Sequence, residues 1–199
     1  LLRDSSIVFI YRIIAAIITL LLTMVITNRL GAEQSGHYFF IISFLSFLLP
    51  LASFGLNNAV LKEISIHLGK SENISSIMTK SIIILFFSFL GVSFIIYTYN
   101  YGSSIYGFSH KIINQYYLLL IISLFPFSII SLFSNYFQAY KYHLLSMLTM
   151  NMGYQVLLLV SIVTFGINSI GPLLSVFVKS LYFIALLIIL WYFFKDKNR

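Results

Sequence analysis

The chain has 199 residues, of which 60% are hydrophobic and 9% are charged, and its formal net charge is +7. About 25% of the residues in a soluble domain are charged, so this composition excludes a protein that covers its surface with water-facing side chains. It predicts an integral membrane protein. The chain has no cysteine, which excludes a metal site built from thiolates.

Apolar segments of about 20 residues, long enough to cross a bilayer as helices, recur along the chain. Six spans are predicted, at residues 6–26, 38–60, 77–98, 116–136, 148–165 and 172–194. They are long and apolar on all sides, whereas the strands of a membrane β-barrel have about 10 residues of alternating polarity. We therefore predict an all-α fold, in which residues 1–199 form a single bundle of six transmembrane helices.

Basic residues are shared unevenly between the links on the two sides of the membrane. If the chain starts in the cytoplasm, only Arg29 and Lys111 lie in external links. The cytoplasmic side then holds Arg3, Lys62, Lys70, Lys80, Lys141, Lys195, Lys197 and Arg199. Because Lys and Arg concentrate in cytoplasmic links, both ends of the chain are predicted to face the cytoplasm. This orientation accounts for the net charge, which therefore does not indicate a nucleic-acid partner.

The links between the spans carry two patterns. Each external turn contains a pair of glycines, at residues 31 and 36, 102 and 107, and 166 and 171. Glycine permits the positive φ of a tight reversal, so the pairs indicate turns, and a weak repeat of helical hairpins is the alternative. Residues 61–70 place apolar and charged side chains on opposite helical faces, which suits a short interfacial helix or a plain solvated loop.

One full charge, Arg12, interrupts the first span. An arginine at mid-helix costs about 2.5–3.5 kcal/mol on insertion scales. At 100° per residue, a polar stripe about 80° wide runs along the span and contains Ser5, Arg12, Ala16, Thr19, Thr23 and Thr27. Arg12 lies about 9 Å from the inner boundary, so its side chain either extends to the interface or faces a polar site.

Further polar side chains lie in the cytoplasmic half of the other spans, namely Asn57, Asn135, Gln138, Asn151 and Gln155. They suit a hydrated cavity, although span ends also tolerate polar residues and small-residue stripes also serve close packing. Lys179 lies about 10 Å from the outer boundary and either reaches that boundary or faces the same cavity as Arg12. Two such cations would suit a phosphate-bearing substrate that crosses the membrane.

Acidic residues and histidines are confined to span ends and links. The spans therefore contain no candidate for a carboxylate proton relay, and no histidines have the spacing of metal ligands. A glycine-rich nucleotide loop and a Ser/His/Asp set are also missing from the sequence. We expect no cofactor, no metal site and no catalytic residues, and hence a protein that is not an enzyme.

Four segments, taken in order, resemble polysaccharide (O-antigen) flippases of the multidrug/oligosaccharidyl-lipid/polysaccharide exporter superfamily. They are Arg12 leading into residues 29–38 (RLGAEQSGHY), residues 54–65 (FGLNNAVLKEIS), residues 137–141 (FQAYK) and the turn at residues 166–171. The resemblance covers most of the chain. It departs from the family pattern at Lys62, beside which relatives often have an arginine.

The resemblance implies the N-terminal half of a transporter with about twelve helices, so that a C-terminal half is missing from this chain. Its function would be to flip an undecaprenyl-diphosphate-linked oligosaccharide across the bacterial inner membrane by alternating access, for O-antigen or lipopolysaccharide synthesis. A cationic residue of the first helix is implicated in holding the diphosphate, and Arg12 matches that position. The implied partners are the lipid-linked oligosaccharide and membrane lipids.

Two alternatives remain open. A cation-coupled drug exporter of the same superfamily usually has an acidic residue in its first helix, where this chain has only Asp4 at the start. A membrane-embedded polymerase or transferase of polysaccharide synthesis would be favoured by a large external loop bearing Arg, His or Asp, and the external links here are short.

Overall fold

The computed structural model describes residues 2–67, 74–106 and 111–197, and the side chains of residues 8–67, 74–99, 101 and 115–192. Every regular element in these ranges is helical, which confirms the predicted all-α class. The elements are α1 (Leu2–Ser53), α2 (Leu56–His67), α3 (Ile74–Tyr106), α4 (Lys111–Ala139), α5 (His143–Met147), the π-helix η1 (Leu148–Met152), α6 (Gly153–Phe165) and α7 (Ile170–Lys197).

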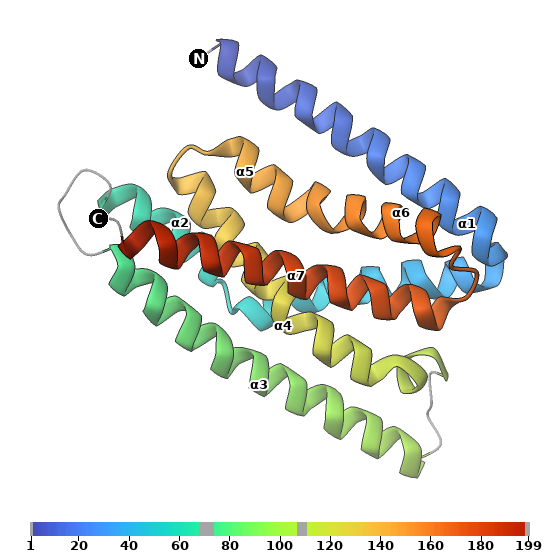
Figure 1. The fold of residues 1–199 in the computed structure, drawn as a ribbon. Helices are drawn as coiled ribbons and strands as arrows, with labels where there is room; N and C mark the ends of the chain where they lie inside the picture. The colour runs from blue at the N-terminus through green and yellow to red at the C-terminus, as the bar shows by residue number, and fades with distance from the viewer. Residues whose placement is uncertain (1, 68–73, 107–110, 198–199) are drawn as a thin grey trace.

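Helix α1 consists of two arms that meet at Gly31. The backbone of Gly31 has φ 77° and ψ 173°, which is not helical, and the second arm runs back alongside the bundle (Figure 1). Within the described residues, five helical segments are long and apolar enough to cross a membrane, and the one at Val8–Ser53 has 46 residues. Each arm of that segment has the roughly 20 residues that a crossing needs. The two arms therefore correspond to the first two predicted spans.

The second predicted span differs most from the structure, because its helix is interrupted before Val60. Phe54 and Gly55 have φ of 49° and 74°, and α2 begins after them and continues to His67. The left-handed region is costly for a residue with a side chain and free for glycine, so Gly55 supplies the local reason for the break. The segment predicted at 61–70 is therefore helical as far as His67, and residues 68–70 lie outside the described part.

At two of the three predicted turns, one glycine of the pair interrupts or ends a helix. Gly31 and Gly166 have positive φ, and Gly166 ends α6 in the left-handed conformation. Their partners in the pairs, Gly36 and Gly171, lie inside helices. The third pair behaves differently, since α3 continues through residue 102 to Tyr106, and residue 107 lies outside the described part.

Helix α4 is the centre of the bundle. It contacts α1, α2, α3, α5 and α7, and 67% of its most apolar stretch is buried, against 17% for α3. Its large side chains Leu124, Ile130 and Phe133 are almost completely enclosed. Small serines such as Ser128, whose hydroxyl donates to the Leu124 carbonyl, let neighbouring helices approach closely. The large apolar side chains exposed on α1, α3 and α7 form the surface that would face lipid.

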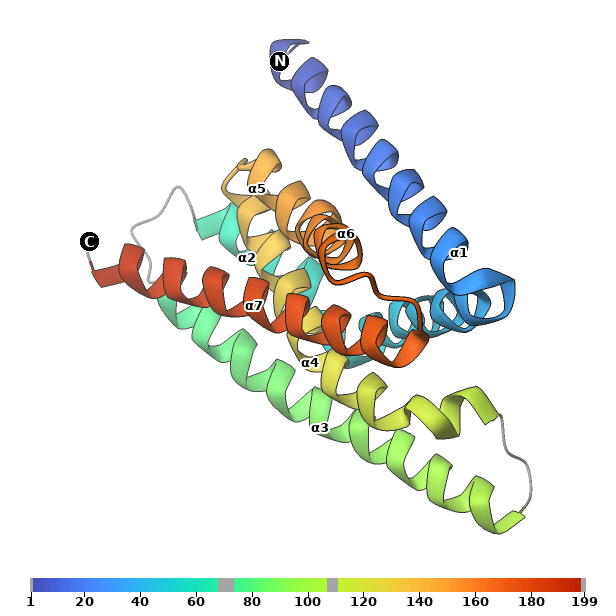
Figure 2. The same ribbon diagram turned by 45° about the vertical axis from the view of Figure 1, so that its right-hand side comes forward.

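The chain ends and the turns between helices are divided between the two ends of the bundle. The start of α1, the end of α7 and the α4–α5 turn lie at one end, and Gly31 and the α6–α7 turn lie at the other (Figures 1 and 2). This agrees with the predicted even number of crossings; which end faces the cytoplasm stays a prediction. In both views the first arm of α1 leans away from the other helices toward its N-terminal end.

Candidate functional site

Arg12 is exposed on the first arm of α1, and it makes no hydrogen bond or ion pair with the described residues. It lies 20° around the helix from Thr19 at 100° per residue. The Thr19 hydroxyl donates a 2.9 Å hydrogen bond to Oε1 of Gln155 on α6. The polar stripe of the first arm, which includes Arg12, therefore lies on the side of that arm that meets α6.

The partner helix carries matching polar residues. Gln155 also donates to the Tyr154 hydroxyl at 3.5 Å, and Asn151 is exposed one turn before Gln155. The first arm and α6 run in the same direction (Figure 1). Measured from the Thr19–Gln155 bond, Arg12 lies about 10 Å and Asn151 about 6 Å toward the end that holds the chain termini. We call Arg12, Thr19, Asn151 and Gln155 the α1–α6 seam.

The two helices of the seam diverge toward the end of the bundle that holds the start of α1 (Figures 1 and 2). The hydrogen bond between Thr19 and Gln155 joins them near the middle of the arm, and the arm leans away beyond it (Figure 2). Arg12 and Asn151, both exposed, lie in this diverging part. An arginine there offers paired donors to a phosphate, and the neighbouring amide can bond to sugar or phosphate oxygens.

Asn151 lies in a π-helical turn, Leu148–Met152, that was not predicted from the sequence. Gly153 donates its backbone N–H to the Leu148 carbonyl, five residues back. A Cβ on Gly153 would lie 2.9 Å from that carbonyl oxygen and 3.0 Å from Cδ1 of Ile184 on α7. Single π-turns are frequent at functional sites. The sequence carries no local signal for this one, since Gly91 also lies within an apolar span and is regular α-helix.

The two predicted asparagines of the second and fourth spans meet in a different place. Asn57 of α2 donates from Nδ2 to the Ser131 hydroxyl at 2.9 Å, and Asn135 donates to the Ser131 carbonyl at 2.8 Å. Ser131 is buried, so the Asn57 amide joins α2 to α4 inside the bundle, whereas the Asn135 bond lies within α4. The side-chain carbonyl oxygen of Asn57, Oδ1, is buried without a hydrogen-bond partner among the described residues.

Gln138 and Lys179 belong to neither group. Gln138 is exposed near the end of α4, and its side chain has no hydrogen bond within the described part of the chain. Lys179 is exposed on α7 on the face opposite the buried Leu181 and Ile184. Ile170 and Leu30 lie next to the two turns at the same end of the bundle. Along the helix axes, Lys179 is about 13 Å from Ile170 and Arg12 is about 27 Å from Leu30. The two cations are therefore at different depths.

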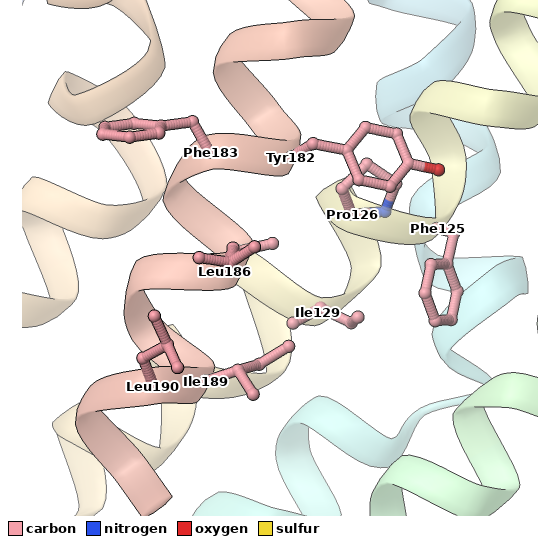
Figure 3. Close-up of a pocket in the computed structure, with 9 residues that line it drawn as sticks. Phe125, Pro126, Ile129, Tyr182, Phe183, Leu186, Ile189 and Leu190 are labelled. Carbon is pink, nitrogen blue, oxygen red and sulfur yellow. The ribbon is translucent and has the colours of Figure 1, made fainter. Parts of the chain in front are cut away.

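An apolar groove of about 410 Å³ runs between α4 and α7 (Figure 3). Its walls are Phe125, Pro126, Ile129, Tyr182, Phe183, Ala185, Leu186, Ile189 and Leu190. The Tyr182 hydroxyl donates to the Ile122 carbonyl at 3.2 Å. Within an α-helix that carbonyl would accept from residue 126, which is a proline without an N–H. Tyr182 thus supplies the donor that Pro126 lacks.

Acidic residues are sparse in the described part of the chain. Glu33 lies beside the Gly31 turn, and Glu63 pairs with His67 at 3.1 Å on α2. No group of three or more histidine, cysteine, aspartate or glutamate side chains in the described residues could hold a metal ion. The polar chemistry of the described spans is therefore carried by amides, hydroxyls and the two cations.

Comparisons with known proteins give one match. A family model described as "polysaccharide biosynthesis protein" matches residues 1–199, which is the whole chain. Neither the curated proteins nor the solved structures give a match.

Proposed function

The chain belongs to the polysaccharide biosynthesis protein family, and from this premise we propose that it takes part in flipping an undecaprenyl-diphosphate-linked oligosaccharide across the bacterial inner membrane. The polytopic helical fold and the family support a role in polysaccharide synthesis or export. The observation that carries the finer proposal is Arg12, an exposed guanidinium without a protein partner among the described residues, on the polar stripe of a membrane helix.

The chemistry of the seam fits the polar head of such a substrate. A guanidinium without a counter-ion in an apolar span is costly, and a phosphate supplies both the charge and the acceptors that offset this cost. In the proposal Arg12 contacts the diphosphate, while Asn151 and Gln155 contact the diphosphate or the first sugar. The predicted roles of Asn57, Asn135, Gln138 and Lys179 in substrate binding stay predictions.

Alternating access requires a second lobe and a movable element. We propose that this chain is one lobe of a twelve-helix transporter with both of the present chain ends in the cytoplasm, and that the first arm of α1 faces the other lobe. The lean of that arm (Figure 1) and its attachment near the middle through Thr19 and Gln155 support this arrangement. The divergent end would then admit substrate from the cytoplasmic leaflet.

A drug exporter and a membrane-embedded transferase receive less support. A cation-coupled exporter needs an ionisable acid in its spans, and among the described side chains Glu33 and Glu63 lie at a turn and on α2. A transferase needs acid, base or nucleophile groups that converge, and the described spans bring together amides and hydroxyls instead. We therefore retain the flippase as the proposed function.

The proposal predicts that Arg12→Ala abolishes polysaccharide export and that Arg12→Lys retains part of it, because a point charge replaces only some of the bidentate contact. Export would be measured in cells that produce the complete protein, with its membrane level checked by immunoblotting. Arg29→Ala, which removes a charge from the same arm beside the Gly31 turn, is the matched control and should export normally. Wild-type export by Arg12→Ala would refute the role of Arg12.

A further inference from the structure

The groove between α4 and α7 lies on the side of the bundle that is turned away from the first arm of α1. Its wall residue Phe125 packs on Phe86 and Phe89 of α3, with ring centroids 6.1 and 5.1 Å apart. In both ribbon views α3 and the first arm of α1 lie on opposite sides of α7 (Figures 1 and 2). The groove is therefore a surface separate from the α1–α6 seam, and its lining is apolar (Figure 3).

Lys179 lies on the same face of α7 as this groove. At 100° per residue, it falls between the groove residues Leu186 and Leu190 on the helical wheel of α7, within about 20° of each. All three side chains are exposed, and Lys179 makes no ion pair or hydrogen bond with the described residues. One unpaired positive charge thus continues the apolar groove along the helix.

This charge lies near the middle of the membrane. The apolar segment of α7 runs from Ile170 to Tyr192, and the Cα of Lys179 is about 13 Å from the first and about 20 Å from the second. The groove follows on the Tyr192 side, where Tyr182 to Leu190 cover about 12 Å. The headgroups of both leaflets are therefore remote from Lys179, and an unpaired charge at such a depth is costly.

A transmembrane helix is the occupant that matches this face. It crosses both halves of the bilayer, so that one helix can meet Lys179 near the middle and the groove in the adjoining half. Helices pack their side chains into the grooves of neighbouring helices. An apolar groove alone gives a protein no advantage over lipid tails, so the lysine supplies the selectivity. Charged side chains within membranes pair with one another, and a carboxylate offers the ammonium both an opposite charge and hydrogen-bond acceptors.

The carboxylate must come from outside residues 1–199. All five acidic residues of the chain lie at the ends of the predicted spans or in the links between them, and they are Asp4, Glu33, Glu63, Glu72 and Asp196. A second copy therefore has none to offer at the depth of Lys179. In the proposed function the second lobe meets the first arm of α1, on the other side of the bundle from the groove (Figure 2). These two points favour a helix of a different protein.

We propose that Lys179 and the α4–α7 groove dock a transmembrane helix of a separate membrane protein, and that this helix carries one aspartate or glutamate at the depth of Lys179. The choice of a separate protein over the second lobe rests on the proposed function. The pairing of Lys179 with a carboxylate does not.

The test uses the complete protein in nanodiscs and a biotinylated leucine–alanine transmembrane peptide with one glutamate at its centre. The photocrosslinker p-benzoylphenylalanine replaces Leu190 in the groove. In the matched control it replaces Ile84, which is exposed on α3 about 160° around that helix from Phe86. At position 190 the glutamate peptide should crosslink at about tenfold lower concentration than the same peptide with glutamine, the ratio expected when a hydrogen-bond partner becomes charged. Position 84 should show no preference.

Variants of Lys179 test the pairing. Lys179→Gln should abolish the preference for glutamate, Lys179→Arg should retain it, and Lys179→Glu should reverse it in favour of a peptide with a central lysine. Arg12→Ala should crosslink like the wild type, so that failure of this inference is distinguishable from failure of the flippase proposal. Equal crosslinking of the glutamate and glutamine peptides would overturn the inference, and so would a preference that survives Lys179→Gln or that is the same at position 84.

The same photocrosslinker in living cells identifies the source of the helix. At position 190 we expect an adduct heavier than the complete protein, which Lys179→Gln should abolish. A crosslink within the complete protein would show that its own second lobe covers the groove, and an adduct with a differently tagged copy would show self-association. Either result, or crosslinks to lipid alone, would contradict docking of a separate protein.

Discussion

The hydroxyl of Tyr182 replaces a backbone hydrogen-bond donor that is missing from α4. Pro126 removes the N–H that would satisfy the Ile122 carbonyl, and in a bilayer no water replaces it. The Tyr182 hydroxyl, from another helix, donates to that carbonyl at 3.2 Å. The tyrosine thereby fixes the approach of α7 to α4 at the level of the proline.

We expect Tyr182→Phe to lower the free energy of unfolding by about 1 kcal/mol, since it leaves a carbonyl without a donor. In a Pro126→Ala background the same change should cost close to nothing, because the alanine N–H restores the helical bond. Unfolding of the four proteins in detergent, followed by circular dichroism, measures this coupling. Equal costs in both backgrounds would show that the hydroxyl does not compensate for the proline.

The amides show what could and could not be predicted at the residue scale. Their polar character and their positions in the spans were readable from the sequence, and so was the stripe that contains Arg12. That Asn57 reaches Ser131 on α4 was not, because it depends on how α2 continues after the positive φ of Phe54 and Gly55. The Thr19–Gln155 bond likewise joins residues far apart in the sequence, and no local pattern indicates such a pairing.

At the scale of elements, the first arm of α1 is the helix whose freedom matters most for the proposed function. Much of its apolar surface is exposed, including Phe9, Ile17 and Leu20. The Thr19 hydroxyl lies 2.9 Å from the Ala15 carbonyl of its own arm and 2.9 Å from Oε1 of Gln155 on α6. The Thr27 hydroxyl bonds to the Thr23 carbonyl within the same arm. Among the described side chains, the Thr19–Gln155 bond is therefore the polar contact between this arm and α6, and its role can be tested.

Thr19→Val should allow the arm to separate from α6 more often. Hydrogen bonds between membrane helices average about 0.6 kcal/mol, so the separated population should rise about threefold. Because the chain lacks cysteine, spin labels at Ile10→Cys and Leu145→Cys can report the separation by pulsed electron resonance. Thr27→Val is the control, and a distance distribution identical for the Thr19 and Thr27 variants would contradict this role for the bond.

Element lengths explain why the spans were predictable and their boundaries were not. Apolar length alone identifies a crossing, and the six predicted spans correspond to the two arms of α1, the α5–η1–α6 segment, α3, α4 and α7. The helices extend beyond the apolar stretches, as α3 does to Tyr106, because polar residues continue a helix outside the hydrocarbon. The π-turn at Leu148–Met152 is followed by Gly153, where a Cβ would lie 3.0 Å from Cδ1 of Ile184 on α7.

For the whole molecule, the arrangement of the ends makes a direct prediction about topology. The Gly31 turn and the α6–α7 turn lie at one end of the bundle, and the α4–α5 turn lies at the other (Figure 1). The excess of basic residues at the second end predicts that it is cytoplasmic. The grouping of the turns follows from the number of helices and agrees with the structure, whereas the orientation rests on charge alone and stays a prediction.

Single cysteines introduced into the cysteine-free chain test this topology in intact cells. Ala32→Cys and Ser169→Cys should react with a membrane-impermeant maleimide added outside, because both positions are exposed at the Gly31 end. Lys62→Cys and Lys141→Cys should react only after the membrane is permeabilised. The reverse pattern of labelling would invert the orientation and with it the direction from which substrate reaches Arg12.

The central claim is that the guanidinium of Arg12 binds the diphosphate of a lipid-linked substrate, and affinity for polyprenyl diphosphate tests it most directly. Purified protein in nanodiscs should bind this ligand at least about tenfold more tightly than Arg12→Ala does, as the loss of a charge-assisted contact of 1.5–3 kcal/mol predicts. Arg12→Lys should fall between them, and Arg29→Ala should match the wild type. Equal affinities for wild type and Arg12→Ala would contradict the account.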